Sequence, residues 1–222
     1  MNNFNKKFDH TLLKPDASQM DILKICRQAT DYGFASVCVN GYYVPFAYRQ
    51  LRDTDVKVAS VAGFPLGAMS SSAKLSEVED SLKNGAQEID MVINIGALKD
   101  GKYEYIKEEL SALSEVCHAQ NAQIKIILET CLLTDEEIKN ACIICEKSSA
   151  DFVKTSTGFS TAGATQKHVK LMKETVGNRV KIKASGGIRT LDDALKMIAA
   201  GADRLGCSAS VDIMKEYMNR KL

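Results

Sequence analysis

Three charged residues stand in short apolar segments of the chain, where an ionised side chain would be buried. They are Asp90 in the segment EIDMVIN, Lys154 in FVKT and Lys183 in KIKAS. An ammonium group that is buried without a partner costs several kcal/mol. One interpretation is therefore a structural ion pair between a lysine and the aspartate. Two lysines would then compete for one carboxylate, which favours a chemical role instead.

The chemistry that these three side chains could perform is amine catalysis. Free lysine has a pKa of about 10.4, so its amine is protonated at neutral pH and cannot attack a carbonyl carbon. A second ammonium roughly 4 Å away costs about 4 kcal/mol at an effective dielectric constant of 20, enough to bring the pKa of one lysine near neutrality. We predict that Lys154 forms a Schiff base, which permits a C–C bond to be made or broken. The positive charge of Lys183 would lower the pKa of Lys154, and Asp90 would donate and accept protons.

Two glycine-containing loops predict a binding site for a phosphate group. Ser185–Ile188 follows the seventh of eight predicted strands, and Leu205–Ser210 lies at the end of the eighth. In (β/α)8 barrels, phosphate groups often bind after these two strands, where glycine amides and a helix N-terminus face the anion. The alternative is that the glycines only permit tight turns.

The elements that must position these residues alternate between short apolar segments and longer helical patterns. The predicted strands are Phe8–Thr11, Ser36–Val39, Lys57–Ala62, Glu88–Ile93, Ile124–Glu129, Phe152–Thr155, Val180–Ser185 and Arg204–Cys207. The predicted helices are Ser18–Tyr32, Val44–Leu51, Ser72–Asn84, Tyr103–Gln120, Asp135–Lys147, Thr165–Val176, Leu191–Ala200 and Asp212–Arg220. This alternation indicates a parallel sheet covered by helices.

Eight units of this kind favour a closed barrel over an open sheet. They average about 28 residues each, a short length for a strand, a crossover and a helix. Helical patterns end at Gly33, Gly85 and Gly201, where glycine can adopt the left-handed conformation, and Thr134 and Glu137 have capping-box spacing. We predict an α/β fold, a single (β/α)8 TIM barrel that forms one domain over residues 1–222. Inward-pointing residues near the carboxyl ends of its strands would form the active site.

Composition and charge exclude several classes of protein. The 29 basic and 28 acidic residues give a formal charge of +1, which offers no electrostatic reason to bind nucleic acid or an anionic membrane. No segment approaches the roughly 18 uninterrupted apolar residues of a membrane span, and the first residues, MNNFNKKFDHTLLKP, lack the apolar run of a signal peptide. The seven cysteines are an odd number in a chain too long to need disulfides. We expect a cytoplasmic protein with reduced thiols.

Other residues that often carry chemistry have structural interpretations here. Cys142 and Cys145 form a lone CxxC inside a helical pattern, which predicts structural burial. His10, His118 and His168 are scattered without metal-ligand spacing. The chain contains neither a P-loop nor a GxGxxG motif. We predict no metal and no cofactor.

Motifs along nearly the whole chain resemble those of the deoxyribose-phosphate aldolase family. In chain order they are DHTLLKP from Asp9, CVN from Cys38, GFPLG from Gly63, EIDMVIN from Glu88, VKTSTGF from Val153 and KASGGIR from Lys183. The resemblance implies a (β/α)8 barrel and a metal-independent class I aldolase. Its substrate would be a small phosphosugar, 2-deoxy-D-ribose 5-phosphate, reversibly cleaved to D-glyceraldehyde 3-phosphate and acetaldehyde in deoxynucleoside catabolism. It also implies a homo-oligomer, a dimer or a tetramer.

The resemblance assigns a role to each matching residue. Lys154 matches the lysine that forms the Schiff base, Lys183 the lysine that perturbs it and transfers protons, and Asp90 the carboxylate that donates and accepts protons. Asp9 matches a carboxylate of the extended proton relay. The residues that match the phosphate-binding region are Gly158, Gly186, Gly187, Gly206 and Ser208.

Two positions depart from the family pattern, and two other functions stay open. Gly41 stands where the family often has proline, so we expect a more mobile loop, and Cys207 stands where threonine or alanine is commoner. Another phosphosugar barrel enzyme is one alternative, either a different Schiff-base aldolase or an isomerase that uses Asp90 as a base. A catalytically inactive sugar-phosphate binding protein is the other.

Overall fold

Eight parallel strands close into a barrel in the order in which they occur along the chain. The computed structural model describes residues 3–220. The strands are Phe8–Leu12 (β1), Ser36–Val39 (β2), Lys57–Ala62 (β3), Glu88–Val92 (β4), Gln123–Ile127 (β5), Phe152–Lys154 (β6), Lys181–Ser185 (β7) and Arg204–Cys207 (β8). The ring closes where β8 pairs with β1, with Asp9 opposite Gly206. The (β/α)8 barrel predicted from the sequence is confirmed.

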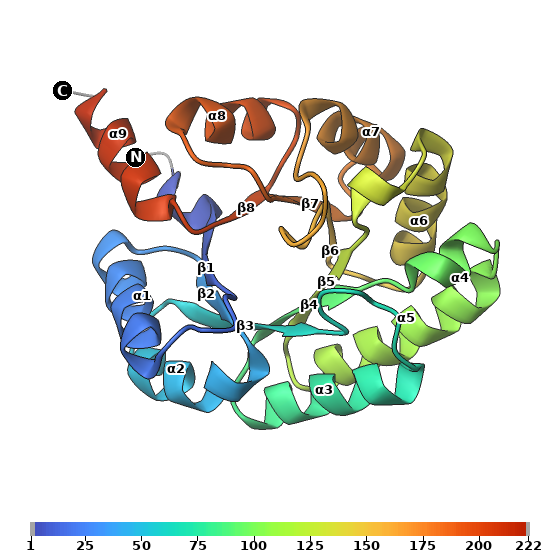
Figure 1. Ribbon diagram of the computed structural model, residues 1–222, viewed down its shortest axis with the longest axis horizontal. Helices are drawn as coiled ribbons and strands as arrows, with labels where there is room; N and C mark the ends of the chain where they lie inside the picture. Colours follow the sequence, from blue (N-terminus) through green and yellow to red (C-terminus); the bar gives the residue numbers. More distant parts are fainter. Residues whose placement is uncertain (1–2, 221–222) are drawn as a thin grey trace.

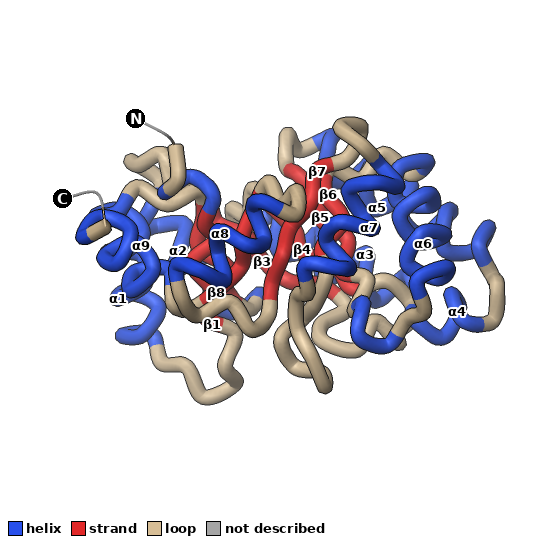
Figure 2. Tube along the Cα trace, turned by 90° about the horizontal axis from the view of Figure 1, so that it is seen from above, coloured by secondary structure: helices blue, strands red, loops and turns tan. Residues whose placement is uncertain are grey.

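Helices surround the strands, as Figure 1 shows. The α-helices are Gln19–Tyr32 (α1), Val44–Leu51 (α2), Ser71–Lys83 (α3), Ile95–Lys99 (α4), Tyr103–Ala119 (α5), Asp135–Lys147 (α6), Gln166–Val176 (α7), Leu191–Ala199 (α8) and Ser210–Asn219 (α9). Short 3-10 helices cover Asn5–Lys7 (η1), Gly41–Tyr43 (η2) and Thr130–Leu132 (η3). Seen from above, the strands lie in the middle of the molecule with helices on either side (Figure 2).

Local signals explain where the helices begin and end. The side chains of Thr134 and Glu137 form the predicted capping box at the start of α6. Gly33 ends α1 in the left-handed conformation, with φ of 63°. Helix α4, Ile95–Lys99, was not predicted, because a five-residue helix is too short to display a helical period.

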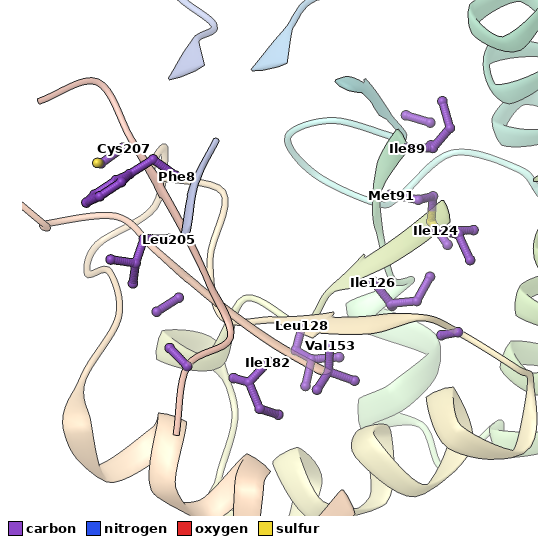
Figure 3. Packing of buried hydrophobic residues seen from close by; sticks show 14 of the residues in the cluster. Phe8, Ile89, Met91, Ile124, Ile126, Leu128, Val153, Ile182, Leu205 and Cys207 are labelled. Carbon is purple, nitrogen blue, oxygen red and sulfur yellow. The ribbon is translucent and has the colours of Figure 1, made fainter. Parts of the chain in front are cut away.

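The core lies between the outer face of the barrel and the helices. Strand residues such as Ile124, Ile126, Val153 and Ile182 are fully buried there, and Figure 3 shows them among the neighbouring buried side chains. Because strand side chains alternate, the residues between them point into the barrel. The fold therefore buries apolar residues outside the barrel and charged residues inside it.

The cysteines are free thiols, and most of them are buried. Burial raises the pKa of Cys142 to about 12, so its thiol is neutral, and Cys145 beside it is also buried. The prediction of structural burial for this pair is confirmed. Within residues 3–220, none of the helices combines the length and the hydrophobicity that crossing a bilayer would require.

Candidate active site

Asp90, Lys154 and Lys183 meet inside the barrel. The carboxylate oxygen Oδ2 of Asp90 lies 2.6 Å from Nζ of Lys154 and 2.6 Å from Nζ of Lys183. The two lysines are register partners on β6 and β7, and β4 carries the aspartate across the lumen. All three side chains are buried, with Lys154 3% exposed. The structure thus brings together the three residues on which the predicted amine chemistry depends.

Asp9 lies on the far side of Lys183. Its Oδ2 is 2.5 Å from Nζ of Lys183, and its Oδ1 accepts a hydrogen bond of 2.5 Å from Arg204. Burial raises the pKa of Asp9, but the positive charges of Lys183, Arg204 and Lys125 outweigh it and hold the pKa well below its usual range. Asp9 is therefore an anion that touches the site through Lys183.

A third lysine, which the sequence reasoning missed, binds the other oxygen of Asp90. Nζ of Lys125 lies 2.8 Å from Asp90 Oδ1 and 2.7 Å from Glu88 Oε2. Arg204 lies 3.3 Å from Glu88 and completes a buried ionic network. The signal was present, because Lys125 stands between Ile124 and Ile126 in a strand, as Lys154 and Lys183 stand in theirs.

The surroundings lower the pKa of Lys154 and raise that of Lys183. Burial is the largest cause for Lys154; Asp90 opposes it, and the positive charge of Lys183 adds to it. Burial acts on Lys183 in the same direction, but Asp9 and Asp90 outweigh it. Asp90 itself stays ionised: burial raises its pKa, and the three lysines lower it further than burial raises it.

This order of causes corrects the explanation drawn from the sequence. The neighbouring ammonium of Lys183 was expected to account for the free amine, whereas desolvation contributes more. Lys183 in turn keeps its proton because it contacts two carboxylates. The site therefore pairs a lysine whose pKa is lowered with a lysine whose pKa is raised.

A cavity of about 250 Å³ opens at the carboxyl ends of the strands and reaches Lys154. All five residues predicted to bind phosphate line it: Gly158, Gly186, Gly187, Gly206 and Ser208. Arg189, which was not among them, also lines the cavity and adds a cation. The structure thus places the predicted nucleophile and the predicted phosphate-binding residues around one cavity.

Two of the glycines in these loops are explained by different structural requirements. Gly187 has a positive φ of 81°, a conformation that residues with side chains rarely adopt, and a Cβ atom there would meet no atom within 4 Å. A Cβ atom on Gly206 would lie 2.9 Å from Cε of Lys183. Gly206 therefore makes room for Lys183, whatever its part in phosphate binding.

Cys207, the departure from the family pattern in this region, is neutral. Its side chain is 7% exposed, and its Sγ lies 3.4 Å from Oγ of Ser210. Burial raises the pKa of the thiol to about 11. The cysteine therefore brings no negative charge toward a bound phosphate. At the other departure, a Cβ on Gly41 would make an ordinary contact of 3.7 Å with Ser81, and the mobility of that loop stays a prediction.

Glu129 anchors the loop that carries Gly158. This side chain is 2% exposed, and its backbone adopts the left-handed conformation with φ of 56°. Its carboxylate accepts hydrogen bonds from both the backbone N–H, at 3.3 Å, and the hydroxyl of Thr157. The Thr157 hydroxyl oxygen in turn accepts a 3.0 Å hydrogen bond from the N–H of Phe159. The sequence predicts Glu129 as the last residue of a strand, whereas β5 ends at Ile127. A left-handed conformation at a glutamate has no sequence signal.

Comparisons with known proteins show the family to which the chain belongs. The model of a protein family described as "DeoC/LacD family aldolase" matches residues 5–215 of the chain. The chain is 53% identical over 211 residues to the deoxyribose-phosphate aldolase of Clostridium tetani, covering 95% of this chain and 97% of that protein.

Two solved structures are also similar. One is described as QR15, an aldolase; it has a TM-score of 0.94 and 42% identity and covers 100% of this chain and 98% of its own. The other is the deoxyribose phosphate aldolase of Aeropyrum pernix, described as having a unique tetrameric structure. It has a TM-score of 0.92 and 32% identity and covers 98% of this chain and 92% of its own.

Proposed function

This chain belongs to the DeoC/LacD family of aldolases, and we propose that it reversibly cleaves 2-deoxy-D-ribose 5-phosphate into D-glyceraldehyde 3-phosphate and acetaldehyde. The relatives' names supply the substrate. The observation that carries the proposed chemistry is Lys154, a buried lysine with a lowered pKa that lines a cavity shared with glycine-rich loops. Such a lysine presents a free amine to a carbonyl compound.

Lys154 begins the reaction by attacking C1 of the open-chain sugar. Its amine adds to the aldehyde carbon, water leaves, and a C=N bond joins C1 to Nζ as a protonated Schiff base. The ammonium of Lys183 bonds the same oxygen of Asp90 as Lys154 does, so it can supply a proton to the departing water.

Cleavage breaks the bond between C2 and C3. A base takes the proton of the C3 hydroxyl, and the electron pair of the C2–C3 bond moves toward the positively charged nitrogen, which leaves an enamine. D-glyceraldehyde 3-phosphate departs, C2 is protonated, and water at C1 releases acetaldehyde and restores the amine. Asp90 carries these protons, and Asp9 extends the relay through its contact with Lys183.

The phosphate group binds at the glycine loops that line the cavity. Gly158, Gly186 and Gly187 line the cavity together with the cation of Arg189, and backbone amides with a cation suit an anion that has several acceptor oxygens. Lys154 and these loops line the same cavity, so the aldehyde and phosphate ends of one small sugar can be held together.

The direct test is acetaldehyde release from deoxyribose 5-phosphate. We expect the purified protein to release acetaldehyde and D-glyceraldehyde 3-phosphate in equal amounts, and to retain this activity after dialysis against a chelator. The carbonyl is activated by an amine here, whereas metal-dependent chemistry would lose activity with its cation. Conversion of the substrate to an isomer without acetaldehyde would overturn the proposal.

Glu129→Gln should weaken binding of the phosphorylated sugar selectively. The neutral amide would hold Thr157 less firmly, and a hydrogen bond to a charged group contributes enough to raise KM for deoxyribose 5-phosphate about tenfold. Cleavage of unphosphorylated deoxyribose should change little, because Lys154 does not contact Glu129. Glu136→Gln, on the exposed surface of α6, is the control. An equal loss with both sugars would show that Glu129 stabilises the whole site instead.

We also propose that the protein acts in the cytoplasm, in deoxynucleoside catabolism, and as a homo-oligomer. The free cysteines suit a reducing compartment. The tetramer of the Aeropyrum pernix enzyme supports an oligomer without deciding between a dimer and a tetramer.

A further inference from the structure

Lys125 is a charged residue of the barrel interior that has no role in the proposed reaction. Its side chain is fully buried, and its Nζ binds Asp90 and Glu88 at 2.8 and 2.7 Å, with Asp9 at 4.0 Å. Lys154 lines the active-site cavity, whereas Lys125 is not among the described residues that do so. Lys125 therefore has no direct route to the substrate, and its effect must pass through its neighbours.

The ionisable side chains that the eight strands direct into the barrel can be counted strand by strand; the buried carboxylate of Glu129 lies beyond β5 and pairs with Thr157. They are Asp9 on β1, the thiol of Cys38 on β2, Glu88 and Asp90 on β4, Lys125 on β5, Lys154 on β6, Lys183 on β7 and Arg204 on β8, while β3 contributes the apolar Ala59 and Val61. Burial raises the pKa of Cys38 to about 11, so its thiol is neutral. Three carboxylates thus face four groups that can be cations. In a buried site, this set is electrically neutral when one of the four has lost its proton.

The contacts select which of the four groups gives up its proton. Arginine does not lose its proton in proteins. Among the ion pairs of residues 3–220, Lys183 contacts two carboxylates and Lys125 contacts three, whereas Lys154 contacts Asp90 alone. Lys154 therefore loses the fewest ion pairs when it becomes a neutral amine.

We propose that Lys125 is a positioning residue: its ammonium fixes one oxygen of Asp90 and supplies the charge that makes the interior neutral when Lys154 carries a free amine. Without Lys125, three carboxylates would face three remaining cations, and neutrality would require a proton on Lys154. Asp90 would also act on two lysines instead of three, which favours the ammonium form of Lys154. This inference rests on the proposed Schiff-base function.

The test uses variants that change the charge balance in opposite directions. Lys125→Met should move the acidic limb of the pH profile of kcat/KM upward by about one to two pH units. Activity at neutral pH should then fall about 10- to 100-fold and recover at higher pH. Glu88→Gln removes one anion and should move the same limb downward. The double variant Lys125→Met/Glu88→Gln removes one charge of each sign and should return the limb close to that of the wild type.

Lys57→Met is the matched control, because it also removes a lysine from a barrel strand but from an exposed position. The pH dependence of borohydride trapping of acetaldehyde on Lys154 gives a second readout that a general loss of packing would not move. If Lys125→Met does not fold, the direction in which Glu88→Gln moves the acidic limb of the pH profile tests the inference. If the wild type is active and the folded variants keep the acidic limb of the kcat/KM profile at the wild-type pH, the inference is overturned. A wild type that neither traps acetaldehyde nor cleaves the sugar would instead overturn the proposed function.

Discussion

Lys154→Ala is expected to abolish cleavage of deoxyribose 5-phosphate, with kcat lowered by at least about 10⁴-fold, the scale of loss when a covalent nucleophile is removed. The same variant should no longer be labelled when acetaldehyde and borohydride are added together. Borohydride reduces the C=N bond and leaves one ethyl group on the lysine nitrogen, so the mass of the intact protein reports the Schiff base directly. Peptide mapping then shows which lysine carries the ethyl group.

Two features of the structure make Lys154 the expected site of labelling. It lines the cavity, and its pKa is lowered chiefly by burial. Lys183 is just as buried but keeps its proton, because Asp9 and Asp90 raise its pKa. Lys170→Ala, on the surface of α7, is the control and should be labelled like the wild type. Full labelling of Lys154→Ala would show that another lysine is the nucleophile.

Asp90→Asn is expected to separate Schiff-base formation from turnover. Asp90 opposes the lowering of the Lys154 pKa, so removal of its charge should lower that pKa further and leave more free amine at neutral pH. Borohydride should therefore still attach acetaldehyde to Lys154. Turnover should fall by about 10²- to 10⁴-fold, the usual contribution of a positioned proton carrier.

The measurement compares the two activities in one protein preparation. Labelling is followed by mass, and turnover by acetaldehyde release, at several pH values. An Asp90→Asn variant that turns over the sugar at nearly the wild-type rate would remove Asp90 from the proton relay. Loss of labelling and turnover together in a folded variant would assign to Asp90 a role in forming the Schiff base itself.

The sequence predicted those parts of the fold and site that have a local signal. β6 and β7 were recognised because short apolar segments alternate with helical patterns, and Lys154 and Lys183 stood out as charges within them. The glycine loops were recognised by composition and by their place after the last two strands. These signals need no knowledge of which strands lie opposite each other.

The features of the site that the sequence did not predict depend on closure of the barrel. Lys125 and Glu88 acquire their importance because β4 and β5 place the ammonium of Lys125 against the carboxylates of Glu88 and Asp90. Asp9 approaches the same ammonium from β1, and no single segment of sequence contains these contacts. The degree of burial is also a property of the whole fold. For that reason the sequence suggested a lowered pKa for Lys154 but ranked the field of Lys183 above desolvation.

The central claim is that Lys154 carries a free amine at neutral pH, and its titration tests that claim most directly. The rate at which each lysine of the ligand-free enzyme reacts with an amine-selective reagent can be followed across pH by peptide mass spectrometry. We predict that the midpoint for Lys154 lies well below the pKa of about 10.4 of free lysine, whereas Lys183 stays protonated where Lys154 reacts. A midpoint for Lys154 at or above that value would contradict the claim.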